Sequence, residues 1–171
     1  MHTVNRYRDT LLEEFHLDDS GTVRRSKDGY FGRFKAGDII QTFETRLGYL
    51  RFHVPRARAT ANLAHLAVLL SGREIPNHLE VDHIDGNKAN NHPENLRVVS
   101  RRVNSCNRKL RKDSSTGQTG IHWSNHHKRY VIRRIIKGVR LSRSRKTFDE
   151  ALQVLEELRQ LDSDYTHRHG K

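Results

Sequence analysis

The longest uninterrupted run of apolar residues in this chain is only five residues long, from Leu66 to Leu70. A membrane-spanning helix needs about 20 such residues, so we expect no membrane partner. Hydrophobic residues make up 34% of the 171 residues, which suits small cores better than one large core. We therefore expect an α+β protein that is built from short helices and small antiparallel sheets.

The first half of the chain alternates short apolar runs with glycines. Apolar residues at helical spacing predict a helix over 4–17, and four β-prone runs between 22 and 54 predict a small antiparallel sheet. A mostly apolar helix is expected over 60–70, with Gly72 just beyond its end. We assign residues 1–112 to an N-terminal module that includes a central polar motif over 81–108.

A second domain is expected after a break in the pattern. Small polar residues over 113–116 predict a linker. Three strands are expected within 121–147, followed by a helix over 149–161 whose apolar residues form one stripe. This predicts a three-stranded sheet packed on one helix over 117–162, followed by a flexible tail over 163–171.

Positive charge is concentrated in one stretch of the chain. The net charge is +12, and residues 101–146 contain 15 Lys and Arg but a single acidic residue, Asp113. Such a stretch favours a polyanionic partner, and its apolar alternation around Trp123 is not typical of a solvated tail. A basic surface without a specific partner and a ribosome-associated protein are the alternatives.

Cysteine usage and the first residues bear on the compartment. The single cysteine, Cys106, excludes an internal disulfide and a cysteine-rich zinc site. The first fifteen residues carry charges throughout, which predicts no signal peptide. We expect a cytoplasmic protein that is not secreted, and no obligatory protein partner is evident.

Residues 80–108 combine groups that suit phosphodiester hydrolysis. The segment predicts a strand, a polar loop, a second strand and a helix that begins at Arg101. His83 is the residue type that most often acts as a general base near neutral pH. Asp82 offers a hard oxygen ligand, and Asn104 offers a second one. Two protein oxygens leave the rest of an octahedral shell to water and phosphate, as Mg²⁺ prefers.

The same segment, EVDHIDGNKANNHPENLRVVSRRVNSCNR, resembles the HNH (ββα-metal) nuclease motif in the asparagine-rich form found in phage-type homing endonucleases. The resemblance implies that His83 is the general base and that Asn95 braces the loop around it. It also implies that Asp82 and Asn104 bind one divalent cation, Mg²⁺ or alternatively Mn²⁺, with Asn107 as an alternative ligand. The implied setting is a phage-encoded enzyme in the bacterial cytoplasm.

Other polar residues of the motif have simpler explanations. Asp85 and Asn87 are expected to form the turn of the loop, and His92 is expected to be exposed. A zinc site that uses His83 and His92 lacks the cysteines usual for such sites.

Residues 117–160 resemble the DNA-binding domain of plant ethylene-response (APETALA-type) factors, which has three strands and a helix. The matching residues are GIHW, RYVIRRI, KTF and DEALQVLEEL, whereas Tyr130 and the pair Arg145–Lys146 depart from that family's pattern. The resemblance implies that the sheet face away from the helix binds DNA. We expect DNA contacts there and beside the motif from Arg97, Arg101, Arg102, Arg108, Lys109, Trp123, Arg129, Arg133, Arg134, Arg140 and Arg143.

The sequence thus predicts a metal-dependent HNH endonuclease that acts on double-stranded DNA. The main alternative is a non-catalytic, sequence-specific DNA-binding regulator in which the motif is only a scaffold. A third hypothesis, an RNA-binding protein of the translation apparatus, predicts a preference for RNA and no dependence on metal.

Overall fold

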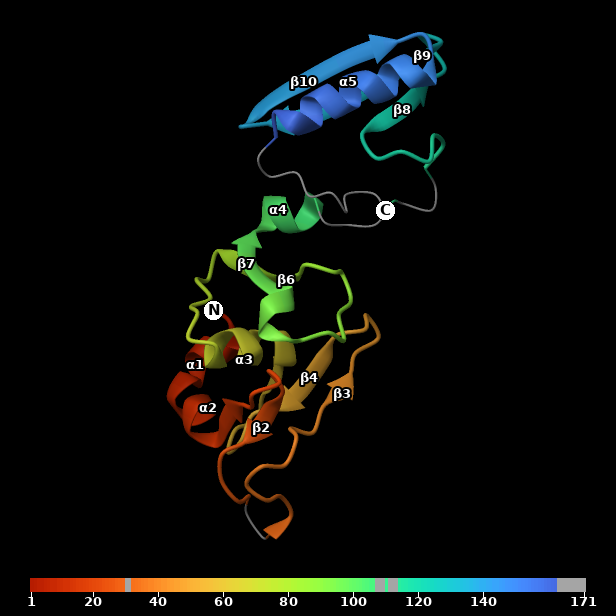
Figure 1. Cartoon of the computed structure of the whole chain (residues 1–171). Helices are drawn as coiled ribbons and strands as arrows, with labels where there is room; N and C mark the ends of the chain where they lie inside the picture. Colours follow the sequence, from red (N-terminus) through yellow and green to blue (C-terminus); the bar gives the residue numbers. More distant parts are fainter. Residues whose placement is uncertain (30–31, 107–109, 111–113, 163–171) are drawn as a thin grey trace. The chain divides into compact units, whose positions relative to one another are not determined.

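The fold is α+β, as the sequence predicts, and it consists of short helices and four small antiparallel sheets within the residues that the structure describes. The computed structural model describes residues 1–29, 32–106, 110 and 114–162 (Figure 1). The chain divides into two units, Met1–Arg101 and Arg102–Lys171. Among the described residues, no helix is long and apolar enough to cross a membrane.

The first unit begins with two short helices, α1 (Thr3–Arg6) and α2 (Arg8–Glu14). They replace the single helix that is predicted over 4–17, because Phe15 already starts strand β1 (Phe15–Leu17), which pairs with β2 (Val23–Arg25). Phe15 and Phe52 are buried and meet edge to face, with ring centroids 5.8 Å apart. This contact joins β1 to the later strand that contains Phe52, and Val4 and Leu11 of the two helices are buried in the same core.

A three-stranded sheet and a buried helix complete that core. Strands β3 (Phe43–Glu44), β4 (Leu50–His53) and β5 (Thr60–Asn62) pair in this order. Helix α3 (Leu63–Leu70) follows β5 directly. The predicted helix over 60–70 therefore starts too early, because residues 60–62 satisfy their backbone hydrogen bonds by pairing with β4. Gly72 adopts φ +79° just beyond the helix, as expected of a terminating glycine.

The polar motif forms a β-hairpin that packs on α3. Strand β6 (Leu79–His83) pairs with β7 (Leu96–Ser100), the short helix η2 (Pro93–Asn95) precedes β7, and α4 (Arg101–Cys106) follows it. The predicted order of strand, loop, strand and helix is confirmed. Leu96 is buried in the same core as α3, so the hairpin is held by the first unit rather than by a core of its own.

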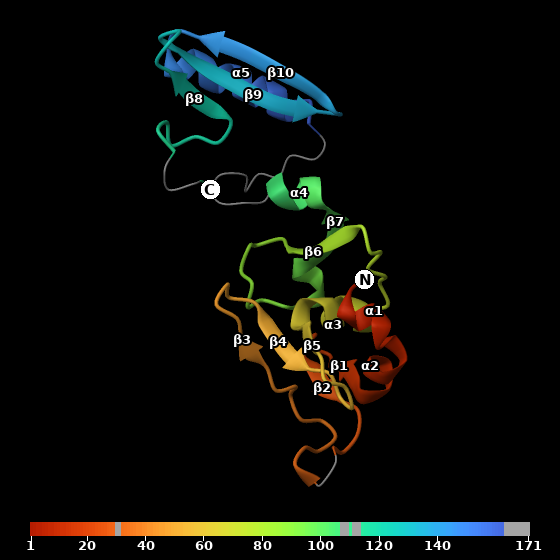
Figure 2. The same cartoon turned by 180° about the vertical axis from the view of Figure 1, so that it is seen from behind.

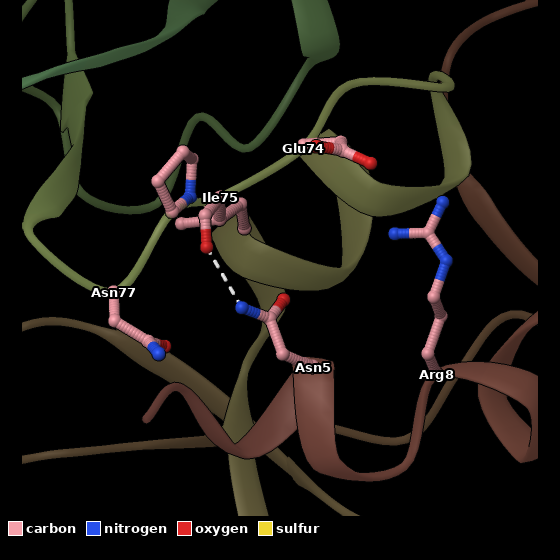
Figure 3. Close-up of a pocket in the computed structure, with 6 residues that line it drawn as sticks. Asn5, Arg8, Glu74, Ile75 and Asn77 are labelled. Carbon is pink, nitrogen blue, oxygen red and sulfur yellow. Dashed lines mark hydrogen bonds between the residues drawn. The ribbon is translucent and has the colours of Figure 1, made fainter.

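The N-terminal helix fixes the segment that leads into β6. Asn5 donates from its side-chain amide to the carbonyl oxygen of Ile75 at 2.7 Å, and a nitrogen of His2 lies 2.9 Å from the carbonyl oxygen of Leu79. Figure 3 shows the hydrogen bond from Asn5 to Ile75, with Arg8 and Glu74 among the other residues that line the polar hollow beside it. These two contacts tie the start of the chain to the start of the hairpin.

The second unit is a three-stranded sheet packed on one helix, as predicted. Strands β8 (Ile121–Ser124), β9 (Arg129–Ile136) and β10 (Val139–Arg145) pair with β9 in the centre. Helix α5 (Phe148–Gln160) covers one face, and Figure 2 shows the sheet from its other face. Thr147 and Glu150 form a capping box at the start of α5. Ile132 and Leu155 are fully buried between the layers.

The boundary between the units lies at Arg101 and Arg102, ahead of the linker predicted over 113–116. The contacts of Arg102 explain in part why the boundary comes earlier than the predicted linker. Its guanidinium donates to the carbonyl oxygen of Ile135 at 2.7 Å and lies 3.4 Å from a carboxylate oxygen of Asp162, so α4 is tied to the sheet and the end of α5. The predicted linker overlaps residues outside the described part of the chain and stays a prediction.

Candidate active site

Asp82 and His83 lie side by side at the end of β6, and both are buried, with 7% and 4% of their surface exposed. Neighbouring residues of a strand point to opposite faces, so their side chains meet different surroundings. Charged and titratable side chains are seldom buried unless they are paired. The partners of each side chain therefore decide what this pair can do.

The carboxylate of Asp82 is paired with Arg97, which is directly opposite in the β6–β7 ladder. The Nε and Nη2 atoms of Arg97 both donate to Oδ2 of Asp82, at 2.9 and 2.7 Å. A guanidinium that uses two donors on a carboxylate makes one of the stronger ion pairs in proteins. The buried negative charge of Asp82 is thereby compensated.

The imidazole of His83 is oriented by Asn91, whose Oδ1 lies 3.2 Å from Nε2. The amide of Asn91 has a defined orientation because its Nδ2 donates to the carbonyl oxygens of Lys88 and Ala89. Its Oδ1 can only accept, so the hydrogen of neutral His83 is on Nε2. The lone pair of a general base is then on Nδ1.

A second histidine near His83, His65 of α3, is half-buried. Burial, followed by the positive charges of His2, His83 and Arg51, lowers the pKa of His65 to about 4. Its ring meets the His2 ring edge to face at 4.9 Å. His65 is therefore neutral near pH 7 and does not add a charge next to His83.

The tip of the β3–β4 hairpin contacts the loop between β6 and β7. Lys88 donates to the carbonyl oxygen of Leu47 at 2.7 Å and lies 4.3 Å from the ring centroid of Tyr49. The Tyr49 ring in turn lies 6.2 Å from the His83 ring. This hairpin supports the surroundings of His83, although nothing in the sequence motif indicates it.

Asn95 joins the two ends of the loop that follows His83. Its Nδ2 donates to Oδ1 of Asp85 and to the carbonyl oxygen of Asn90, at 2.9 and 2.8 Å, and its Oδ1 accepts from the backbone of Asp85 at 3.0 Å. Asp85 also accepts from the backbone of Asn87, which forms the turn expected there. Although burial works against it, hydrogen bonds from Asn90, Asn95 and Asn87 lower the pKa of Asp85, which stays ionised.

We expect Asn95→Ala to loosen this loop without removing a reactive group. Three hydrogen bonds of a half-buried amide are lost, which lowers the free energy of unfolding by about 1–3 kcal/mol. Hydrogen exchange over residues 84–95 should become faster. Asn87→Ala is the control, because it removes one exposed contact, from the backbone of Ala89 at 3.1 Å. Equal exchange rates in both variants would contradict the bracing role.

The donor atoms at the hairpin suit a hard divalent cation. Asp82 presents a buried carboxylate, the ligand type that Mg²⁺ prefers, and such a cation keeps several water ligands. The described residues contain no group of three His, Cys, Asp or Glu that would form a complete cage. His92 caps η2 by accepting from the backbone of Glu94, which argues against the zinc alternative. Asn104 lies in α4 within the second unit, and Asn107 lies outside the described residues.

The open face of the second unit, away from α5, is basic. Strand alternation places Arg133 on this face, and Arg129, Arg133 and Arg140 are all exposed. A hollow of about 380 Å³ occurs there. It is lined by His122, Ser124, His126, His127, Val131, Arg133, Ser142, Arg143 and Ser144. Burial and then the charge of Arg133 lower the pKa of His122, so its imidazole is neutral near pH 7.

Two residues predicted for this face are on the other one. Arg134 is 8% exposed and forms an ion pair with Asp162, because it shares the α5-facing side of β9 with Ile132 and Ile136. The ring centroids of Trp123 and Tyr130 are 4.8 Å apart, and those of Tyr130 and Phe148 of α5 are 5.4 Å apart, so both rings lie on the helix side. The prediction that Arg134 and Trp123 lie on the face away from the helix is therefore wrong.

The predicted DNA contacts beside the motif have different surroundings. Arg97 is paired with Asp82, and Arg102 is tied to Asp162 and the sheet of its own unit. Arg101 is exposed at the end of the first unit. Arg108 and Lys109 lie outside the described residues.

The comparison with protein families matches the same segment. Residues 63–106 match the HNH endonuclease family model. The match runs from the first residue of α3 to the last residue of α4 and includes Asp82, His83, Asn95 and Asn104. The match therefore covers both the polar motif and α3, the helix that supports the hairpin.

Two individual proteins are also similar. Protein 3.8 of Escherichia phage T7 is 42% identical over 50 residues, which are 29% of this chain and 41% of that protein. The chain thus spans less than half the length of this curated relative. The solved structure described as DNA binding and cleavage by the HNH homing endonuclease I-HmuI aligns over 84% of this chain and 78% of its own. Its TM-score of 0.43 at 20% identity is too low to establish a shared fold.

Proposed function

We propose that this chain is a metal-dependent endonuclease of the HNH type that hydrolyses phosphodiester bonds in double-stranded DNA. The observation that carries the proposal is the buried pair Asp82 and His83 at the end of β6, within the segment that matches the HNH family. A carboxylate and an oriented imidazole next to each other are the groups this hydrolysis needs. A phage-infected bacterial cytoplasm is the proposed setting.

In this proposal His83 is the general base. With its hydrogen on Nε2, which faces Asn91, it takes a proton from the attacking water through Nδ1. The water oxygen bonds to phosphorus, the bond from phosphorus to the 3′-oxygen breaks, and the products carry a 5′-phosphate and a 3′-hydroxyl. Asp82 and Asn104 would hold one divalent cation, Mg²⁺ or Mn²⁺, which supplies Lewis-acid stabilisation of the charge on the phosphate and leaving oxygen.

The open face of the second unit is the proposed DNA grip. Its exposed arginines suit phosphate oxygens or guanine edges, as those of DNA-binding sheets do. The proposed contacts from this unit are Arg129, Arg133 and Arg140, together with Arg143, which lies opposite Ile132 in the β9–β10 ladder but lines the same hollow. The likeness of this unit to the APETALA-type domain remains part of the proposal.

Arg133 and Arg134 provide a test of this face because they are neighbours on opposite sides of β9. We expect Arg133→Gln to weaken DNA binding and to reduce the slope of log affinity against log salt by about one unit, since one phosphate contact is lost. Arg134→Gln should instead lower the melting temperature, because it leaves the buried carboxylate of Asp162 with a weaker partner. The reverse pattern in a salt-dependent binding assay would show that the faces are assigned wrongly.

The alternatives predict different products. A DNA-binding regulator would shift duplex DNA in a gel and leave it intact in Mg²⁺, and a translation-associated protein would prefer RNA of the same sequence. The test is to incubate the full chain with plasmid, linear duplex and RNA, with Mg²⁺ or with EDTA. The proposal requires nicked or linear plasmid in Mg²⁺ alone, and binding without cleavage in both conditions would favour the regulator.

A further inference from the structure

The two side chains of the Arg97–Asp82 ion pair differ in their exposure to solvent. The side chain of Asp82 is 8% exposed, whereas that of Arg97 is 28% exposed. The pair of Arg134 and Asp162 in the second unit differs, because both of those side chains are buried, at 7% and 3% exposure. Arg97 thus neutralises a buried carboxylate from a position that solvent and solutes can reach.

Both donor atoms of Arg97 use the same oxygen of Asp82, Oδ2. The two nitrogens lie 2.9 and 2.7 Å from this oxygen, so a cation bound to the Asp82 carboxylate would lie close to the positive charge of the guanidinium. Like charges at this distance repel each other strongly in a poorly solvated site. The cation and the guanidinium therefore compete for the same carboxylate.

We propose that Arg97 is an internal counter-ion of Asp82 that a divalent cation displaces, and that the displaced guanidinium then binds the substrate phosphate. The first step compensates the buried negative charge and holds the carboxylate in place before the metal arrives. The second step rests on the proposed nuclease function, and it follows from the chemistry of a guanidinium at a half-exposed position beside a phosphate site. Arg97 is a positioning residue in the first state and a phosphate ligand in the second.

The proposal predicts that removing Arg97 strengthens metal binding and weakens cleavage. We expect Arg97→Gln to bind Mn²⁺ about two- to fivefold more tightly than the wild-type chain, which is the effect of losing one partly exposed ion pair. Arg97→Lys should be intermediate, because an ammonium keeps the charge but loses the two-donor geometry. Cleavage at saturating metal should fall in both variants.

The experiment titrates the full chain with Mn²⁺ in the absence of DNA and follows free Mn²⁺ by electron paramagnetic resonance. Arg58→Gln is the matched control, because Arg58 is an exposed arginine of the same unit and its loss changes the net charge equally. Asp82→Asn should abolish the tighter binding. Circular dichroism verifies folding, and Arg97→Lys carries the test if Arg97→Gln does not fold.

The inference is overturned if the folded Arg97 variant binds Mn²⁺ no more tightly than the wild type, which includes no detectable binding by either. An equal gain in Mn²⁺ affinity in Arg58→Gln would also overturn it, because the change in net charge would then explain the effect. Tighter binding to Arg97→Gln together with no cleavage by the wild type would leave the counter-ion role standing. That outcome would reject the nuclease proposal alone.

Discussion

Replacing His83 with Ala is expected to slow plasmid cleavage about 10²–10⁴-fold, the usual contribution of a general base. DNA affinity should stay nearly unchanged, because a buried imidazole held by Asn91 contributes little to contacts with the DNA backbone. The measurement is a single-turnover cleavage time course in Mg²⁺, together with a gel-shift titration of the same protein. The combination separates loss of chemistry from loss of binding.

His78→Ala is the control for this variant. His78 is exposed and lies just before β6, so its loss removes an imidazole without touching the buried pair. It should cleave at the wild-type rate. Equal rates for His83→Ala and wild type would exclude His83 as the base, and a parallel loss of DNA affinity would indicate that the substitution disturbs the hairpin.

Ending the chain after Lys112 is expected to reduce DNA affinity by about 10²–10⁴-fold at physiological salt, while some metal-dependent nicking remains. The truncation removes the open basic face with nine Lys and Arg and one Asp from the basic stretch, residues 113–146. The hairpin strands and α3 belong to the first unit and are retained. The slope of log affinity against log salt should flatten by about one unit for each phosphate contact that is lost.

Binding to cognate and random duplexes across a salt series, for full-length and truncated protein, gives both slopes. Equal slopes together with undiminished discrimination between the duplexes would show that residues 117–160 do not bind DNA in the way proposed. Loss of nicking with a folded truncated chain would show that the second unit is needed for chemistry as well as for binding.

The sequence predicts the hairpin well because its signals are local. The strand boundaries around Asp82 and Leu96 follow from alternation and from the Asp85–Asn87 turn, and the structure confirms the elements. Helix α5 is also predicted correctly, because its apolar stripe occurs within thirteen residues. Elements of this kind depend little on distant contacts.

The errors arise where pairing between distant segments decides the outcome. Residues 60–62 become a strand because β4 is next to them, and Arg134 turns inward because α5 covers its side of β9. His65 and Tyr49 belong to no motif, so their places near His83 follow from packing alone. Asp82 and Arg97 pair because β6 ends at His83 and β7 begins at Leu96, which sets the two residues opposite each other in the ladder.

The most direct test of the central claim is the cleavage of supercoiled plasmid by the full chain across a Mg²⁺ titration, with EDTA as the starting point. We expect no cleavage in EDTA, a rate that rises and saturates with Mg²⁺ as one bound ion requires, and products that carry 5′-phosphate and 3′-hydroxyl ends. Cleavage that persists in EDTA, or plasmid that stays intact at saturating Mg²⁺ and Mn²⁺ while bound to the protein, would contradict the account.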